Sequence, residues 1–282
     1  MPNTFYTDAR IYDILHGTDT TDEVDALERI AKRFCPHALN HGSTWLEPAC
    51  GTARHLRLLA KRKRSVLGFD AEPAMVRFAR QTLGSRVFRA RFDDFLTKRP
   101  KTKADLAFVL INTIRHAHTD REMLSHFRQI ARSLNPSGIY IVGLSLSLYG
   151  FESPTEDVWS GSRDGTRVTQ VVQYIPPEGQ GTKDRDEHVH SHLTITSGKR
   201  TRHTDSTYTL RTYSFDQWRK LIAKSPFEVI GVTDQDGVPT KPSPLGYNVF
   251  ILAPRAAKHP TPKPKPAKRR PPKRRKGAEK AP

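Results

Sequence analysis

Short apolar runs alternate with amphipathic stretches over the first half of the chain. The runs read TWLEP, SVLGFD, RVFRAR, ADLAFVLI and GIYIVGLS, at residues 44–48, 65–70, 86–91, 104–111 and 138–145. Runs of this length predict strands. Because strands that alternate with helices form parallel sheets with right-handed crossovers, the pattern predicts a parallel sheet.

Two of the stretches between these runs carry clear helix-start residues. PAMVRFARQTL begins at Pro73, a residue suited to the first helical turn. TDREMLSHFRQIARSL opens with Thr119 and Glu122, the spacing of a capping box, and continues with an apolar stripe. The segment Asn135-Pro136-Ser137-Gly138 is expected to stop that helix.

After residue 145 the apolar period drops to two. RVTQVVQYI, HVHSHLTIT and STYTLRTYS predict antiparallel strands, which form an insertion over about 150–213. A helix with a Ser214–Gln217 capping box and two strands, FEVIGVTD and YNVFILA, follow. The predicted fold is α/β: a doubly wound, mostly parallel, seven-stranded Rossmann-like sheet with helices on both faces, plus an antiparallel β-rich insertion.

Charge divides the 282-residue chain into a body, 1–254, and a tail, 255–282. The tail holds twelve Lys and Arg against one acid, which leaves +7 of the net charge of +18 to the body. Because the tail has no apolar residue larger than alanine, we expect it to be disordered. It either contacts nucleic acid or another polyanion, or only aids solubility.

Targeting and redox features are sparse in this sequence. No run approaches the roughly 18 apolar residues of a membrane span, and no secretory signal is visible at the N-terminus. Cys35 and Cys50 form neither a disulfide framework nor a metal set. We therefore expect a cytoplasmic protein with no membrane partner.

Acidic and small residues follow four successive predicted strands. They are Glu47 with the turn 49–53, Asp70, the pair Asp93 and Asp94, and the pair Asn112 and Thr113. Ligands of open parallel sheets bind outside the carboxyl ends of the strands, so these residues are expected to meet in one cleft. Small residues let backbone approach a ligand, and an acid ending the second strand can accept hydrogen bonds from two ribose hydroxyls. An acid after the third strand can accept from an adenine amine.

The motifs LEPACGTARHL, VLGFDAEPAMVRFAR, ARFDDF and LNPSGIYIVGLS, in this order, resemble those of class I S-adenosylmethionine-dependent methyltransferases. The resemblance covers roughly residues 6–254 and implies S-adenosyl-L-methionine as cofactor. The cofactor-binding residues that it implies are Tyr12, Glu47, Ala49, Cys50, Gly51, Asp70, Ala71, Met75, Asp93, Asp94 and Asn112.

Each implied residue has a place along the cofactor. Glu47 would lie near the amino end of the methionine portion, the Ala49 and Gly51 backbone beneath the sulfonium, and Asn112 beside the transferable methyl. Asp70 would hold the ribose, with Ala71 and Met75 lining the cleft, and Asp93 would meet the adenine amine with Asp94 or Phe95 nearby. Tyr12, in RIYDILHG, would approach the carboxylate.

The turn departs from the family pattern because Ala49 and Ala53 stand where glycine is common. Alanine can hold a tight turn if its φ stays negative, so cofactor binding is still expected. Cys50 lies within the turn, where its small size is a sufficient explanation and a redox role is not expected.

Methyl transfer from a sulfonium depends mainly on placing the acceptor, so no strict catalytic triad is expected. His116, His118 and Tyr149 are candidates to take a proton from the acceptor, with rim or packing roles as the alternative. His188, His190 and His192 share one strand face, and a solvated face fits them better than a zinc site. No metal is predicted.

These observations favour a methyltransferase whose acceptor is a small molecule, because the insertion is similar to the lid of small-molecule members. The chain lacks the Asn/Asp-Pro-Pro-aromatic run of base amino methyltransferases and the Pro-Cys of cytosine-C5 enzymes. The basic tail keeps two alternatives open: a nucleic-acid-associated methyltransferase and a catalytically silent polyanion-binding protein. A nicotinamide-dependent oxidoreductase is a further alternative.

Overall fold

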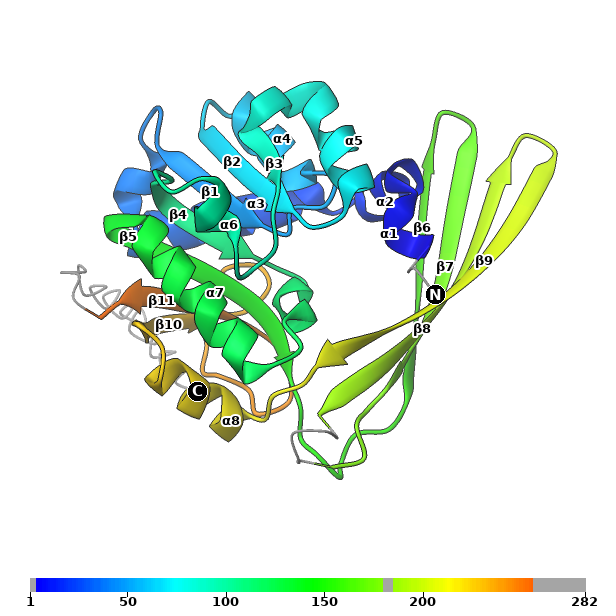
Figure 1. Ribbon diagram of the computed structural model, residues 1–282. Helices are drawn as coiled ribbons and strands as arrows, with labels where there is room; N and C mark the ends of the chain where they lie inside the picture. The colour runs from blue at the N-terminus through cyan, green and yellow to red at the C-terminus, as the bar shows by residue number, and fades with distance from the viewer. Residues whose placement is uncertain (1–3, 180–184, 256–282) are drawn as a thin grey trace, which may run out of the picture.

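A computed structural model describes residues 4–179 and 185–255, and its strands form two separate sheets (Figure 1). The predicted tail lies outside the described residues apart from Arg255. The helices, with 3-10 helices labelled η, are α1 (Thr4–Thr7), α2 (Ala9–His16), α3 (Thr20–Phe34), η1 (Pro36–Leu39), α4 (Arg54–Lys61), α5 (Pro73–Leu83), η2 (Gly84–Arg86), α6 (Phe95–Lys98), η3 (Thr113–His116), α7 (Asp120–Ser133) and α8 (Phe215–Ala223).

The larger sheet, sheet A, has seven strands in the order β10-β11-β5-β4-β1-β2-β3. Its strands are β1 (Thr44–Pro48), β2 (Ser65–Asp70), β3 (Val87–Arg89), β4 (Ala104–Val109), β5 (Leu134–Leu146), β10 (Phe227–Thr233) and β11 (Gly246–Pro254). The first five strands are parallel, and β11 runs antiparallel to both β5 and β10. The predicted mostly parallel, seven-stranded sheet is confirmed.

Helices cover both faces of sheet A because successive strand residues point to opposite sides. On β1, Trp45 packs in the core under α3, α4 and α5, whereas Leu46 packs in the core under α7 and α8. Burying each large apolar side chain contributes about 1.5–3 kcal/mol. The capping boxes predicted at Thr119–Glu122 and Ser214–Gln217 are both present and fix the starts of α7 and α8.

Two predicted strands are shorter in the structure. The segment predicted at 86–91 keeps only Val87–Arg89 as strand, and the segment predicted at 104–111 ends at Val109. Ile111 and Asn112 have positive φ values of 51° and 60°, so the backbone turns sharply there despite the apolar sequence. This early turn opens the edge of the sheet where the site lies.

The smaller sheet, sheet B, is antiparallel, with the strands in the order β6-β7-β8-β9. They are β6 (Thr155–Arg163), β7 (Thr166–Ile175), β8 (Asp186–Ser197) and β9 (Arg200–Arg211). Sequence periodicity predicted three of these strands and missed β6. This edge strand is exposed at nearly every position, so it shows no apolar alternation.

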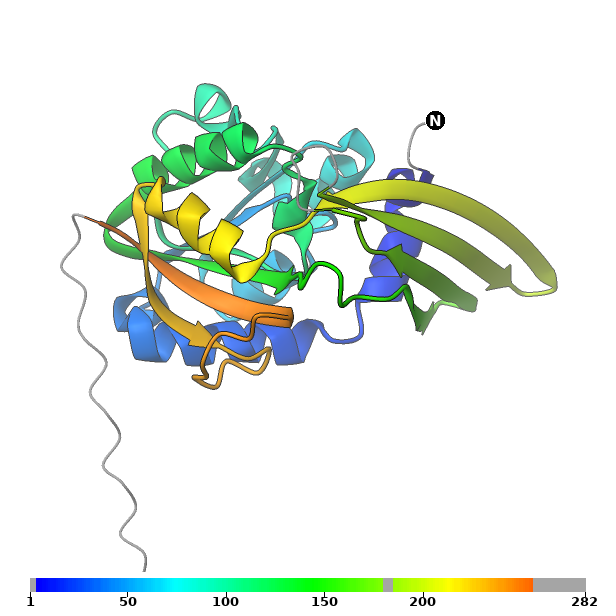
Figure 2. The same cartoon turned by 90° about the horizontal axis from the view of Figure 1, so that it is seen from below.

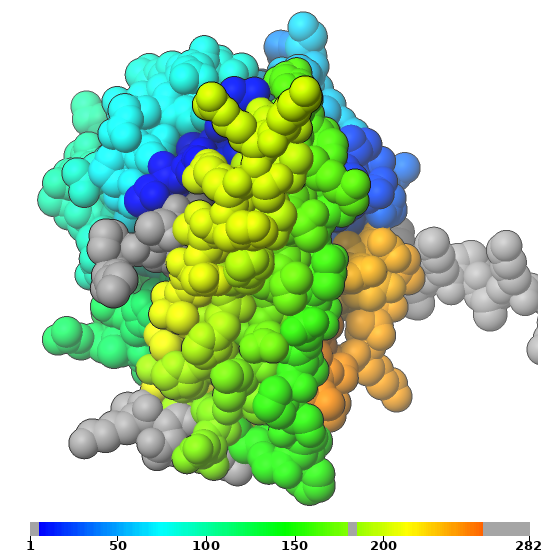
Figure 3. Space-filling model, turned by 90° about the vertical axis from the view of Figure 1, so that its right-hand side faces the viewer, coloured from blue at the N-terminus to red at the C-terminus, as the bar shows by residue number. Residues whose placement is uncertain are grey.

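Sheet B projects away from sheet A, with α1 and α2 lying against it (Figure 2). Its inner face carries Val168, Leu193 and Ile195, which pack on Ile11 and Ile14 of α2. Its outer face forms one side of the molecule (Figure 3) and carries the exposed His188, His190 and His192, as predicted. Among residues 4–179 and 185–255, no helix is long and apolar enough to cross a membrane.

Candidate functional site

Two adjoining cavities lie at the carboxyl ends of the sheet A strands, and the second of them also borders sheet B. The first, called here the cleft, has a volume of about 500 Å³ and is lined by Tyr6, Thr7, Tyr12, Ala49, Gly51, Phe69, Asp70, Ala71, Glu72, Met75, Ala90, Arg91, Phe92, Asp93, Thr113, His116, Ala117, His118 and Glu122. The second, called here the inner cavity, has a volume of about 130 Å³. Its floor comes from the ends of β1 and β4 and its roof from sheet B.

The turn after β1 has a different backbone from the one predicted. Ala49 and Ala53 have φ values of 48° and 57°, so the expectation that these alanines keep a negative φ is wrong. The turn bends back on itself because Cys50 N donates to Phe69 O at 2.9 Å and Ala53 N donates to Cys50 O at 2.7 Å. A left-handed alanine costs roughly 1–2 kcal/mol, and these hydrogen bonds hold the conformation.

Asp70 ends β2 and turns its carboxylate into the cleft. Oδ2 accepts from Gly51 N at 2.7 Å and Oδ1 accepts from Glu72 N at 2.8 Å. Burial raises the pKa of Asp70 to about 6, although the two backbone hydrogen bonds oppose this rise. Each carboxylate oxygen can accept more than one hydrogen bond, so Asp70 retains capacity for a ligand hydroxyl.

Glu47 is buried in the floor of the inner cavity, with 6% of its surface exposed. Oε1 lies 2.6 Å from His55 Nδ1, but Oε2 has no hydrogen-bond partner. A buried carboxylate oxygen without a donor is costly. The site is therefore suited to a ligand that brings an N–H or O–H donor to Glu47.

Two loops carry the remaining polar residues expected at the strand ends. Asp93 lines the cleft, whereas Asp94 lines neither cavity and accepts from Arg91 N at 2.7 Å through Oδ1. Asn112 lines the inner cavity, with Nδ2 donating to Ser145 Oγ at 3.1 Å and Oδ1 accepting from Ser145 N at 2.6 Å. Asn112 therefore also ties the end of β4 to β5.

The other predicted residues of the turn and of α5 are divided between the cavities. Ala71 and Met75 line the cleft, and Cys50 lines the inner cavity. Burial, with the nearby Asp70 and Glu47 charges, raises the pKa of the Cys50 thiol well above its usual range. Cys50 therefore stays a neutral, small side chain, in keeping with the prediction that size is its contribution.

The three candidates for proton transfer differ in position. His116 lines both cavities, His118 lines the cleft alone, and Tyr149 lines neither. The Tyr149 hydroxyl lies 2.9 Å from Thr212 Oγ1 and 3.0 Å from Gln217 Oε1, so it ties the loop after β5 to the segment after β9 and to α8. The expectation that Tyr149 lies at the cleft mouth is therefore not met.

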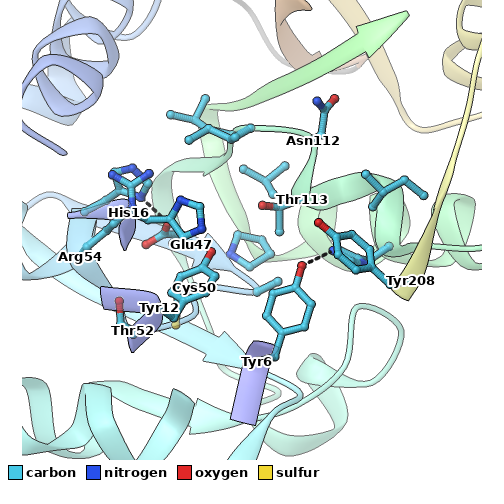
Figure 4. A pocket seen from close by; sticks show the side chains of 18 of the residues that line it. Tyr6, Tyr12, His16, Glu47, Cys50, Thr52, Arg54, Asn112, Thr113 and Tyr208 are labelled. Atoms are coloured by element: carbon cyan, nitrogen blue, oxygen red, sulfur yellow. Dashed lines mark hydrogen bonds and ion pairs between the residues drawn. The ribbon is translucent and has the colours of Figure 1, made fainter. Parts of the chain in front are cut away.

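His116 makes a hydrogen-bonded pair with Tyr6 of α1. The Tyr6 hydroxyl lies 3.1 Å from His116 Nε2. Burial, and then the charges of His118 and Arg115, lower the pKa of His116 to about 4. Its imidazole is therefore neutral at physiological pH. Tyr6 and Tyr208 lie on one side of the inner cavity, and Glu47, Arg54 and His16 lie on the other (Figure 4).

Several lining residues were missed from the sequence. From sheet B they are Trp159, Gln170, Val172, Tyr174, Tyr208 and Leu210, and from the helices Tyr6, His16, Arg54 and His55. The period-two pattern located the inner face of sheet B. No local pattern shows which part of that face would lie over sheet A, because the placement depends on the tertiary fold.

Comparisons with known proteins agree with this architecture. A family model described as a methyltransferase domain matches residues 46–138. The chain is 24% identical, over 69% of its length and 79% of the relative's, to dTDP-3-amino-3,4,6-trideoxy-alpha-D-glucopyranose N,N-dimethyltransferase from Streptomyces venezuelae.

Solved structures also resemble most of the chain. DesVI from Streptomyces venezuelae has a TM-score of 0.67 at 21% identity, covering 87% of this chain and 98% of that one. The sugar N-methyltransferase KedS8 from a Streptoalloteichus species has a TM-score of 0.63 at 22% identity, covering 84% and 89%. These structural likenesses show that the chain shares their fold.

Proposed function

We propose that this chain, which belongs to the class I S-adenosylmethionine-dependent methyltransferases, transfers a methyl group to an amine of a small molecule held beneath sheet B. One observation carries the proposal. Tyr6, Tyr12, Ala49, Thr113 and His116 line both the cleft and the inner cavity. A methyl donor with its adenosine half in the cleft and its amino acid half on the floor of the inner cavity would therefore meet, at this shared wall, an acceptor held under sheet B.

The residues present fit the cofactor. The unpartnered Oε2 of Glu47 needs a donor such as the cofactor ammonium, and Asp70 can accept from the ribose hydroxyls. Asp93, Phe92 and Met75 all line the cleft, where an adenine would find both an acceptor and apolar contacts. When bound, the cofactor supplies a methyl group already activated by a sulfonium.

The inner cavity favours a small acceptor. Its volume is about 130 Å³, and sheet B covers it with Trp159, Tyr174 and Tyr208. The buried Gln170 donates from Nε2 to Ser191 Oγ at 2.7 Å, which leaves its carbonyl oxygen available for an acceptor group. The dTDP-amino sugar N,N-dimethyltransferase and the sugar N-methyltransferase KedS8 named above act on sugars, which supports an amine on a sugar-like molecule.

His116 and Tyr6 are the proposed proton acceptor and its partner. An amine attacks only through its free lone pair, so the proton of the ammonium form must be removed. The Tyr6 hydroxyl, 3.1 Å from His116 Nε2, can receive that proton while it passes its own proton to Nε2 of the neutral ring. Asn112 and the aromatic roof hold the acceptor in place, and correct placement supplies much of the rate.

A radiolabelled-methyl assay tests the proposal. Amino sugars, free and nucleotide-linked, should accept label, whereas their hydroxyl analogues, RNA and protein should not. His116→Gln should lower kcat by about 10²-fold. His190→Gln, on the exposed outer face of sheet B, is the matched control and should retain activity. Label that enters only RNA or protein would overturn the small-molecule acceptor.

A further inference from the structure

We propose that His55 and Glu23 are positioning residues that hold the Glu47 carboxylate in the orientation needed to capture the amino group of the cofactor. This inference rests on the proposed function, because it assigns a ligand to Glu47. It extends the site to α3, a helix that does not line either cavity.

A continuous chain of polar side chains runs from α3 to the floor of the inner cavity. His55 lies between two carboxylates, with Nδ1 at 2.6 Å from Glu47 Oε1 and Nε2 at 2.8 Å from Glu23 Oε2. Arg54 donates to both oxygens of the same Glu23, through a short contact with Oε2 and a hydrogen bond of 3.0 Å to Oε1. His55 and Arg54 begin α4, so the chain joins α3, α4 and β1.

The two contacts of His55 identify its charge state. A neutral imidazole carries one N–H, so it can donate to only one of two carboxylates. Short contacts on both ring nitrogens fit the imidazolium, which donates twice. Burial, as the largest influence, and Arg54 oppose the charge, but Glu47 and Glu23 together raise the pKa of His55. Phe108 of β4 also packs against His55, with the centres of the two rings 5.8 Å apart.

The charges of this cluster balance. Two carboxylates, Glu23 and Glu47, face two cations, Arg54 and His55. Hydrogen bonds with His55 and Arg54 outweigh burial and lower the pKa of Glu23 to about 2, so Glu23 stays ionised. The amino acid group of the cofactor carries one positive and one negative charge, so it adds no net charge to this cluster. The balanced cluster is therefore suited to bind a zwitterion.

Removing the His55 ring would change Glu47 in a defined way. Both Glu47 oxygens would then lack donors, because Oε2 already has none. A buried carboxylate without donors is costly, and nothing would then hold the Glu47 carboxylate in the orientation that meets an ammonium group. The variant should therefore bind ligands that carry the amino group more weakly, and its affinity for other ligands should not change.

Two probes separate these cases. S-Adenosylhomocysteine carries the amino acid group, and 5′-methylthioadenosine shares the adenosine half without it. By isothermal titration at neutral pH, His55→Gln should weaken S-adenosylhomocysteine about tenfold or more, the range of a lost charged hydrogen bond. Binding of 5′-methylthioadenosine should change less than about twofold. Glu23→Gln should weaken S-adenosylhomocysteine binding by a smaller factor and likewise leave 5′-methylthioadenosine binding nearly unchanged.

Arg62→Gln is the matched control because Arg62 also joins α4 to α3. It pairs with Asp25 at 2.6 Å and Glu28 at 2.8 Å, away from Glu47. If the His55 effect reflected only weaker docking of α3, Arg62→Gln would reproduce it. We expect Arg62→Gln to bind both probes as the unaltered protein does.

The outcomes of these titrations distinguish the positioning role from the cofactor assignment. Equal weakening of both probes in His55→Gln and Glu23→Gln, or no weakening in either variant, would overturn the positioning role while leaving the cofactor assignment intact. Failure of the unaltered protein to bind S-adenosylhomocysteine would overturn the proposed function and this inference together. A selective loss in both variants, absent in Arg62→Gln, supports it.

Discussion

At the scale of single residues, Asp70 combines two properties that oppose each other. Two backbone N–H groups stabilise its carboxylate, at 2.7 and 2.8 Å, while burial favours the protonated form. The balance raises the pKa to about 6, close to physiological pH. A ligand that donates hydrogen bonds to the ionised form must therefore compete with a proton.

Affinity for S-adenosylhomocysteine is predicted to fall in acid for this reason. Above pH 6 Asp70 is ionised and accepts from the ribose, and below its pKa of about 6 the proton blocks that role. The dissociation constant should rise about tenfold per pH unit below that point. Titration calorimetry from pH 5 to 8 measures it. Asp70→Asn should bind weakly without this pH step, and a flat profile in the unaltered protein would contradict the role of Asp70.

Sequence spacing located the polar residues after each strand, because local patterns mark where a strand ends. The cluster of Glu23, His55 and Glu47 could not be found in this way, since 32 residues separate Glu23 from His55. The positive φ of Ala49 was also missed, because nothing local to an alanine indicates that hydrogen bonds elsewhere will hold it there.

At the scale of elements, α2 contacts both α4, which follows the turn after β1, and sheet B. Asp13, almost fully buried, pairs with Arg57 of α4 and lies 2.8 Å from Arg163 of β6. Ile11 and Ile14 of the same helix pack on the inner face of sheet B. The N-terminal helices and sheet B therefore form one cover: α1 and α2 line both cavities, and sheet B lines the inner cavity.

Gly161→Ala is predicted to loosen this cover. A Cβ at Gly161 of β6 would collide with the Ile14 carbonyl, a backbone group that can yield only if α2 shifts. We expect a loss of about 1–3 kcal/mol in unfolding free energy and faster hydrogen exchange in α2. The KM for the acceptor should rise. Ser160→Ala, at the exposed neighbouring position, is the control. Unchanged exchange in α2 would contradict the close approach.

At the scale of the whole molecule, the two sheets have separate tasks in the proposed reaction. The edge of sheet A supplies the residues placed beside the cofactor, and sheet B supplies the roof of the inner cavity. The alternation of strands and helices predicted the first sheet well. How the second sheet docks was not predictable, because the aromatic residues that face sheet A look like any inward-facing residues of a strand.

The basic tail is predicted to act independently of methyl transfer. Residues 256–282 carry eleven Lys and Arg and one acid, whereas the cavities lie wholly within residues 6–210. Removing 256–282 should abolish salt-dependent binding to RNA, measured by fluorescence anisotropy, and leave kcat and KM for a small acceptor unchanged. If the truncated protein bound RNA as tightly and with the same salt slope, the tail would not be the contact.

The roof of the inner cavity is built from one uninterrupted stretch of chain between residues 155 and 211. Its inner side bears the aromatic residues and Gln170, and none of the residues at the ends of β1, β2 and β3 belongs to it. Mutation and recombination can therefore exchange the whole roof as a unit, without altering the cofactor edge. Acceptor range can diversify in such a lineage while the methyl donor is inherited unchanged. A directed-evolution library would reach new substrates fastest if it were confined to these strands.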